Sequence, residues 1–203
     1  MEKRHRIFIA INLPEEIKKD LSLYSKKWSR PSRGSSMAES PEQELPAKWT
    51  PKDNLHITLE FLGSLTDEEI GEVCLIAKGV AERHNCFSLN LKQILYGPPK
   101  KMSPKMVWAE GEKSKELTLL RQDLENSLTE KIRFVPENRT FAPHITLARI
   151  SAWEWRGIEP EERPEINENL DLMFSVESIE VMESELHRGG PVYTILESHQ
   201  LNS

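Results

Sequence analysis

Short apolar runs alternate with longer amphipathic stretches along this chain. Residues 6–11 (RIFIAI) predict a buried strand, because they are apolar and β-prone and are followed by Pro14, which cannot continue a central strand. In residues 15–27 acidic residues come first and apolar residues recur at spacings of three and four, which predicts an amphipathic helix. The same criteria predict strands at 55–62, 87–95, 106–110, 142–150, 173–183 and 192–197, and helices at 67–84 and 114–131.

Two polar segments interrupt this order. In residues 29–46 serine, proline, glycine and glutamate crowd together and apolar residues almost vanish. Such a segment buries too little apolar surface to offset the entropy lost on ordering, so we predict a flexible insertion there. Residues 153–170 are polar as well and predict a second long loop.

The predicted elements occur in two copies of one pattern. The first copy reads RIFIAINL, helix, LHITLEFL, helix, FSLNLKQI, and the second reads MVWAEGEK, helix, PHITLARI, loop, FSVESIEV. His56 and Phe87 of the first copy lie 31 residues apart, and His144 and Phe174 of the second lie 30 apart. Phe8 lies 48 residues before His56, whereas Val107 lies 37 residues before His144. The excess of 11 residues in the first copy matches the insertion at 29–46.

This duplication predicts a single bilobal domain over residues 1–203 with an α+β fold. Two pseudo-symmetric lobes of antiparallel sheet, each with flanking helices, are expected to face each other across a central groove. Each lobe then delivers one His-Ile-Thr-Leu sequence.

The two His-Ile-Thr-Leu sequences are the candidate site. Side chains alternate between the faces of a strand, so His56 and Thr58 share one face and the neighbouring leucines and isoleucine the other. His144 and Thr146 repeat this division in the second copy. If a pseudo-twofold axis relates the lobes, both His-Thr pairs converge on the groove.

Two facing histidines suit general acid–base catalysis, because an imidazole with a pKa near 6.5 exists in both protonation states near neutral pH. The threonine hydroxyls can donate hydrogen bonds to an anion held between them, and a phosphodiester fits this arrangement. A metal site lacks a third ligand: strict alternation places Glu60 on the face of His56, but Ala148 occupies the matching position. We therefore expect no metal and no cofactor.

Composition narrows the function class. The chain of 203 residues has a net charge of −6, which argues against binding long nucleic acids through its overall field. Its first apolar run is too short to span a bilayer, so no membrane association is expected. Two cysteines without a CxxC spacing are typical of a reducing compartment, and we expect a cytoplasmic, monomeric protein.

The sequences RIFIAINLP, LHITLEFLG, PHITLAR and ESELHRGGPVYTIL together resemble the two-histidine (2H) phosphoesterases, in particular the RNA 2′,3′-cyclic phosphodiesterases formerly called 2′-5′ RNA ligases. The resemblance runs from Arg6 to about Leu196. It implies metal-independent hydrolysis of a 2′,3′-cyclic phosphate at an RNA 3′ end, or in a cyclic nucleotide, to a 2′-phosphate. By the same resemblance His56 is the proton donor and His144 the proton acceptor, while Thr58 and Thr146 hold phosphate oxygens.

Phe61 and Arg149 each lie five residues beyond a candidate histidine and resemble family positions that hold a nucleobase. Strict alternation places both on the core side of their strands, so this contact requires the strands to twist or end before them.

Two other functions remain open at this stage. The same acid and base would serve a 2′-5′ phosphodiesterase or a reversible 2′-5′ RNA ligase, because the catalysed reaction runs in both directions. A nucleotide- or RNA-binding module without turnover is the other alternative.

Overall fold

The computed structural model describes residues 3–28, 45–98, 103–132, 134–137 and 140–203. Most of the predicted insertion at 29–46 lies outside these residues. The strands are β1 His5–Asn12, β2 Ala47–Trp49, β3 His56–Leu65, β4 Phe87–Gly97, β5 Met106–Gly111, β6 His144–Ile150, β7 Asn167–Val176, β8 Ser178–His187 and β9 Gly190–Gln200. The helices are α1 Glu15–Lys26, α2 Asp67–Ala81, α3 Lys115–Lys131 and α4 Ala152–Arg156, with short 3₁₀ helices η1 Lys52–Asn54 and η2 Pro160–Glu162.

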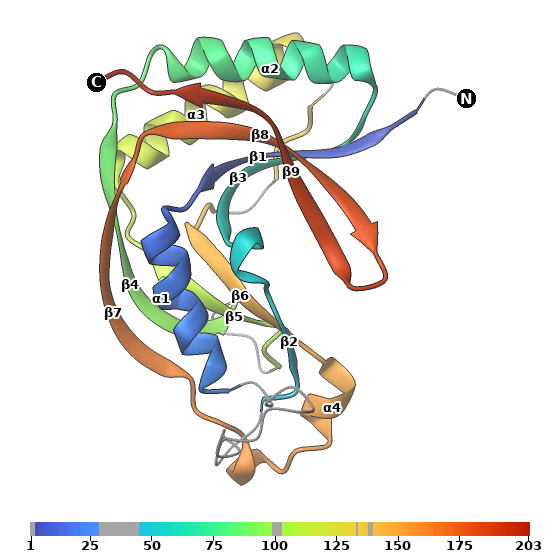
Figure 1. Ribbon diagram of the computed structural model, residues 1–203, viewed down its shortest axis with the longest axis vertical. Coiled ribbons are helices and arrows are strands. Elements are labelled where there is room, and N and C mark those ends of the chain that lie inside the picture. Colours follow the sequence, from blue (N-terminus) through green and yellow to red (C-terminus); the bar gives the residue numbers. More distant parts are fainter. Residues whose placement is uncertain (1–2, 29–44, 99–102, 133, 138–139) are drawn as a thin grey trace.

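The strands form one curled antiparallel sheet in the order β7-β4-β5-β6-β3-β1-β8-β9, with β2 paired to β6 (Figure 1). β3 and β6 meet at the middle of this order, where Ile57 pairs with Ile145. The predicted α+β class with two antiparallel halves is confirmed, and the two halves are continuous through this pair.

Each half of the sheet contains strands from both sequence copies. β4 of the first copy pairs with β5 of the second, and β8 of the second copy pairs with β1 of the first. The helices are exchanged as well: α3 packs against β3, and Lys27, just after α1, forms an ion pair with Glu168 of β7. Neither copy could therefore complete its half of the sheet alone.

Two parts of the sequence-based prediction are wrong near the C-terminus. The predicted strand 173–183 is two strands, β7 and β8, separated at Glu177. The predicted loop 153–170 contains most of α4, all of η2 and the start of β7. β7 lies at the edge of the sheet and exposes many polar side chains, which is why its first half resembles a loop in sequence.

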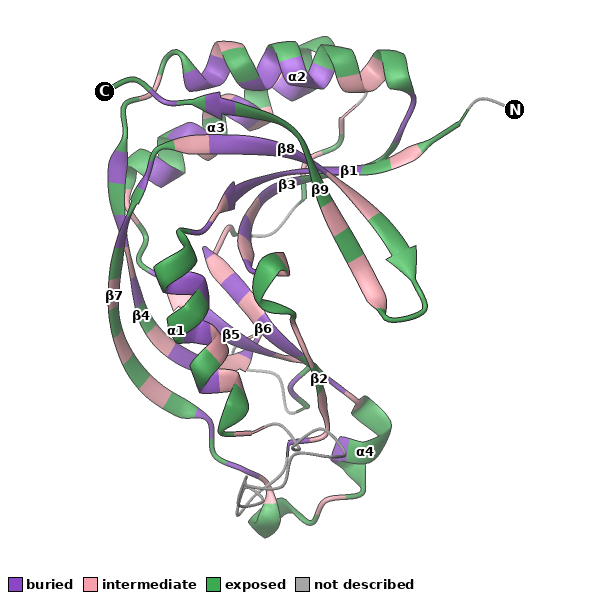
Figure 2. Cartoon of the chain, in the orientation of Figure 1, coloured by how far each residue is buried: buried purple, intermediate pink, exposed green. Residues whose placement is uncertain are grey.

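The core lies between the strands of the sheet and the helices α1, α2 and α3. The buried residues of α3 are four leucines in one stripe, Leu117, Leu120, Leu124 and Leu128. Figure 2 shows β1 buried over much of its length and β3 buried mainly in its first half, whereas the β8–β9 hairpin projects with exposed ends. The histidine strands are anchored in the core by the buried apolar residues of their His-Ile-Thr-Leu sequences, Ile57 and Leu59 in β3 and Ile145 and Leu147 in β6.

Both histidine strands contain a β-bulge at the same place in their motif. In β3 the register shifts so that Leu59 has no partner in β1, and in β6 it shifts so that Leu147 has none in β5. The bulge reverses the alternation that follows, so Glu60 is only 3% exposed and lies on the core side. The expectation that Glu60 shares the face of His56 is therefore wrong.

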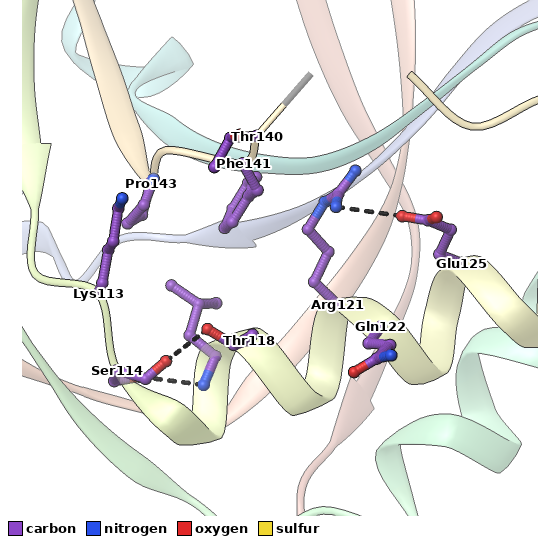
Figure 3. A pocket seen from close by; sticks show the side chains of 10 residues that line it. Lys113, Ser114, Thr118, Arg121, Gln122, Glu125, Thr140, Phe141 and Pro143 are labelled. Atoms are coloured by element: carbon purple, nitrogen blue, oxygen red, sulfur yellow. Dashed lines mark hydrogen bonds and ion pairs between the residues drawn. The ribbon is translucent and has the colours of Figure 1, made fainter. Parts of the chain in front are cut away.

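Buried Glu60 forms an ion pair with Arg121 of α3, with Nη2 and Oε1 2.9 Å apart. The same guanidinium is 3.1 Å from Glu125, donates from Nε to the Leu59 carbonyl at 3.4 Å, and lies 4.8 Å from the centre of the Phe141 ring. Figure 3 shows Arg121 between Phe141 and Glu125. All three residues line a cavity of about 400 Å³. Arg121 thus links the bulge of β3 to the segment that leads into β6.

Replacing Glu60 by glutamine is expected to flatten the pH dependence of folding stability. Burial raises the pKa of Glu60 to about 7 against the opposing effect of Arg121. The folded chain then binds this proton more tightly than the unfolded chain, so the free energy of unfolding falls as pH rises from about 4.5 to 7, by at most about 1.4 kcal/mol per pH unit. Urea unfolding of the wild type and Glu60→Gln between pH 4.5 and 8 measures this pH dependence of the free energy of unfolding.

Glu125→Gln is the matched control, because Glu125 touches the same guanidinium but is 30% exposed. Parallel pH profiles for the wild type and Glu60→Gln would contradict this assignment.

Candidate active site

The Ile57–Ile145 pair brings the four candidate polar residues together. In an antiparallel register the residue before one isoleucine faces the residue after the other, so His56 lies opposite Thr146 and His144 opposite Thr58. Both isoleucines are fully buried, whereas the four polar side chains are half-buried. They therefore share the opposite surface of the sheet, called here the histidine face.

Each imidazole is oriented by a carbonyl two residues before it. Nδ1 of His56 lies 2.8 Å from the Asn54 oxygen, and Nδ1 of His144 lies 2.8 Å from the Ala142 oxygen. A carbonyl oxygen only accepts, so Nδ1 carries the hydrogen and Nε2 is the chemically active nitrogen in both rings. Nε2 of His56 lies 3.0 Å from the Thr58 hydroxyl.

The two imidazoles have different aromatic neighbours. His144 stacks on Trp108, with ring centres 3.8 Å apart. His56 lies 5.0 Å from Phe8 of β1, and 5.1 Å from Tyr193 in an edge-to-face contact. Tyr193 comes from β9, which lies outside the duplicated pattern, so it distinguishes the two halves of the site.

The β8–β9 hairpin also holds the loop in front of His56. Asn54 donates from Nδ2 to the Pro191 carbonyl at 2.7 Å, while its own carbonyl accepts from His56. Sequence reasoning missed Asn54 and the ring of Tyr193. The only signal for the latter was its place in the C-terminal GGPVYTIL sequence.

His56 is a weak base in the free protein. Burial lowers its pKa from 6.5 to about 4, opposed by the hydrogen bond to Asn54 and assisted by the charges of His144, Lys18 and Arg149. Lys18 of α1 is itself 5% exposed and was not among the sequence candidates. At pH 7 the imidazole of His56 is therefore neutral.

The bulges turn Phe61 and Arg149 outward. Phe61 is 59% exposed, and its ring centre lies 6.1 Å from that of Phe8. Arg149 is exposed, approaches the Met106 sulfur at 3.7 Å, and lowers the pKa of His56. Both side chains thus belong to the histidine face, in spite of strict alternation.

Among the described residues no group of three or more His, Cys, Asp or Glu side chains could hold a metal ion. No helix in the described ranges is long and apolar enough to cross a membrane.

A model of the LigT-like phosphoesterases matches the chain twice, at residues 35–108 and 109–193. The chain belongs to this family. Each match contains one His-Ile-Thr-Leu sequence. The resemblance to two-histidine phosphoesterases is confirmed, and with it the enzyme class.

Several relatives share most of their length with this LigT-like phosphoesterase. An RNA 2′,3′-cyclic phosphodiesterase of Thermus thermophilus is 32% identical over 200 residues, covering 97% of this chain and 90% of the relative. One from Thermotoga maritima is 29% identical over 198 residues, with coverage of 94% and 92%. A crystal structure of a Thermus thermophilus protein superposes with a TM-score of 0.77 at 29% identity, covering 97% of both chains. Escherichia coli LigT in complex with 3′-AMP has the same fold, with a TM-score of 0.72 at 24% identity and coverage of 99% and 100%.

Tyr193→Ala is expected to raise the pKa of His56 toward 6.5, because removal of the ring admits water and burial is the main cause of the low value. Tyr193→Phe keeps the ring and should leave the pKa near 4. Proton NMR titration of the imidazole Cε1–H signals measures both variants. An equal pKa in wild type and Tyr193→Ala would show that the ring does not exclude water from His56.

Proposed function

We propose that this LigT-like phosphoesterase hydrolyses RNA 2′,3′-cyclic phosphate ends to 2′-phosphates without a metal ion. One observation carries the proposal: two imidazoles, each with Nδ1 held by a carbonyl, lie on one face of the sheet around the Ile57–Ile145 pair. The names of the relatives support the substrate class.

In the proposed reaction His144 accepts a proton from water at Nε2. The water oxygen attacks phosphorus, and the bond between phosphorus and the 3′ oxygen breaks. His56 donates its Nε2 proton to the departing 3′ oxygen, which leaves a 2′-phosphate and a free 3′-hydroxyl. Each turnover leaves His144 protonated and His56 neutral, and proton exchange with solvent restores both.

Protonation of His56 has to come with substrate binding, since its pKa of about 4 leaves it neutral in the free protein. A phosphate negative charge about 4 Å away contributes roughly 4 kcal/mol at an effective dielectric constant of 20. That energy favours the protonated ring by about a thousandfold. The substrate thus generates the acid that cleaves it, because the bound phosphate brings the pKa of His56 close to neutral pH.

The threonines and the exposed residues bind the substrate in this proposal. Thr58 and Thr146 donate hydroxyl hydrogen bonds to the non-bridging phosphate oxygens, which lie between the two strands. Phe61 and Arg149 present an aromatic face and a planar guanidinium, and both can stack on the terminal base. These four residues and the two histidines are all on the histidine face.

We also propose that the enzyme acts as a single-domain monomer in the cytoplasm. Both histidines come from one chain and one continuous sheet, so the site needs no second subunit. Cys86 is an exposed free thiol and Cys74 a buried one, which suits a reducing compartment.

His56→Ala and His144→Ala are each expected to lower turnover by about 10²–10⁴-fold on an oligonucleotide with a 2′,3′-cyclic phosphate end. His84→Gln is the control, because His84 pairs with Asp123 between α2 and α3, away from the histidine face. Assays contain excess EDTA, and the product ends are identified by chromatography.

Near-normal turnover in either alanine variant would contradict the role of that histidine. Loss of wild-type activity in EDTA with recovery in zinc or manganese would contradict the metal-independent mechanism. A 2′-5′-linked oligonucleotide assayed in parallel tests the alternative: faster cleavage of this substrate would make the protein a 2′-5′ phosphodiesterase. Binding of both without turnover would make it a binding module.

A further inference from the structure

Two cations stand side by side where β2 joins the sheet. Lys48 of β2 pairs directly with Arg149 of β6, so both side chains project from the same surface, and both are exposed. Like charges on directly opposed residues repel each other and destabilise a strand pair. No carboxylate of the described residues forms an ion pair with either side chain, although Glu154 lines the neighbouring cavity.

Lys48 extends from this strand toward the β8–β9 hairpin. A Cβ built on Gly190 would lie 3.0 Å from the Lys48 ammonium nitrogen. The next residue, Pro191, accepts the hydrogen bond from Asn54, whose carbonyl holds His56. The ammonium group is therefore placed at the approach to the His56 side of the site, between Arg149 and the hairpin.

A positively charged pair next to the histidine face is suited to a phosphate other than the one being cleaved. The net charge of the chain is −6, so this positively charged pair is opposite in sign to the chain as a whole. Lysine binds phosphate as a compact point charge, and neutralising one backbone phosphate makes affinity depend on salt.

We propose that Lys48, beside Arg149, binds the phosphodiester that joins the terminal nucleotide to the rest of the RNA chain. This inference rests on the proposed function and specifies its substrate class: RNA ends rather than free cyclic mononucleotides. A nucleoside 2′,3′-cyclic phosphate with a 5′-hydroxyl lacks this group, so Lys48 contributes nothing to its binding.

Three substrates with EDTA present test the proposal. They are a nucleoside 2′,3′-cyclic phosphate, the same compound with a 5′-phosphate, and a dinucleotide with a 2′,3′-cyclic phosphate end. Lys48→Ala is expected to lower kcat/KM about tenfold for the two that carry the extra phosphate and less than twofold for the first. The slope of log kcat/KM for the dinucleotide against log salt should fall by about 0.7.

Lys48→Arg keeps the charge and should restore most of the lost kcat/KM. Lys78→Ala removes an exposed lysine of α2, a helix that carries none of the residues of the proposed site, and should match the wild type on all three substrates. A loss limited to the dinucleotide would assign Lys48 to the second base instead of the phosphate. Equal losses on all three substrates, or none, would overturn the proposal while leaving the proposed function intact.

If the wild type cleaves none of the three substrates, the proposed function fails. The site is then tested by calorimetry with a dinucleotide that ends in a 2′-phosphate. Weaker binding of this dinucleotide by Lys48→Ala, with unchanged binding of the corresponding mononucleotide, supports the phosphate site. Equal binding by wild type and Lys48→Ala rejects it.

Discussion

The pairing of Ile57 with Ile145 is the contact on which the site depends. Both side chains are fully buried, and their pairing joins the two halves of the sheet. Each half of the sheet also contains elements of both sequence copies: β8 pairs with β1, β4 pairs with β5, and α3 packs against β3. The two halves therefore cannot form separately. The core therefore fixes the positions of His56 and His144 relative to each other, as acid–base catalysis on one phosphate requires.

The duplication supplies two equivalent histidines, but catalysis needs unequal ones. Each ring donates from Nδ1 to a carbonyl two residues upstream, and each has an aromatic ring of the neighbouring strand beside it, Phe8 for His56 and Trp108 for His144. The difference comes from β9, which places Tyr193 against His56 and helps to exclude water. Burial then makes His56 a neutral ring in the free protein. In the proposed reaction the charge of the bound phosphate favours its protonation.

Much of this arrangement is encoded in patterns that a single sequence reveals. The repeat and the alternation within His-Ile-Thr-Leu were enough to predict the fold class and to put His56, Thr58, His144 and Thr146 on one face. The bulges at Leu59 and Leu147 were not predictable, because an extra residue in a ladder depends on the partner strand. They reverse the expected positions of Glu60 and Phe61. The edge strand β7 and the three-residue β2 lack a clear apolar pattern, so the cation pair at Lys48 appears only in three dimensions.

The central claim is that the two histidines have fixed, different roles at one phosphate. Hydrolysis of a cyclic-phosphate-terminated oligonucleotide in ¹⁸O-labelled water, followed by ³¹P NMR, tests it most directly. With water activated by His144 and the 3′ oxygen protonated by His56, every product molecule carries a 2′-phosphate with one ¹⁸O atom. A mixture of 2′- and 3′-phosphates, or 3′-phosphate alone, would contradict the assigned roles.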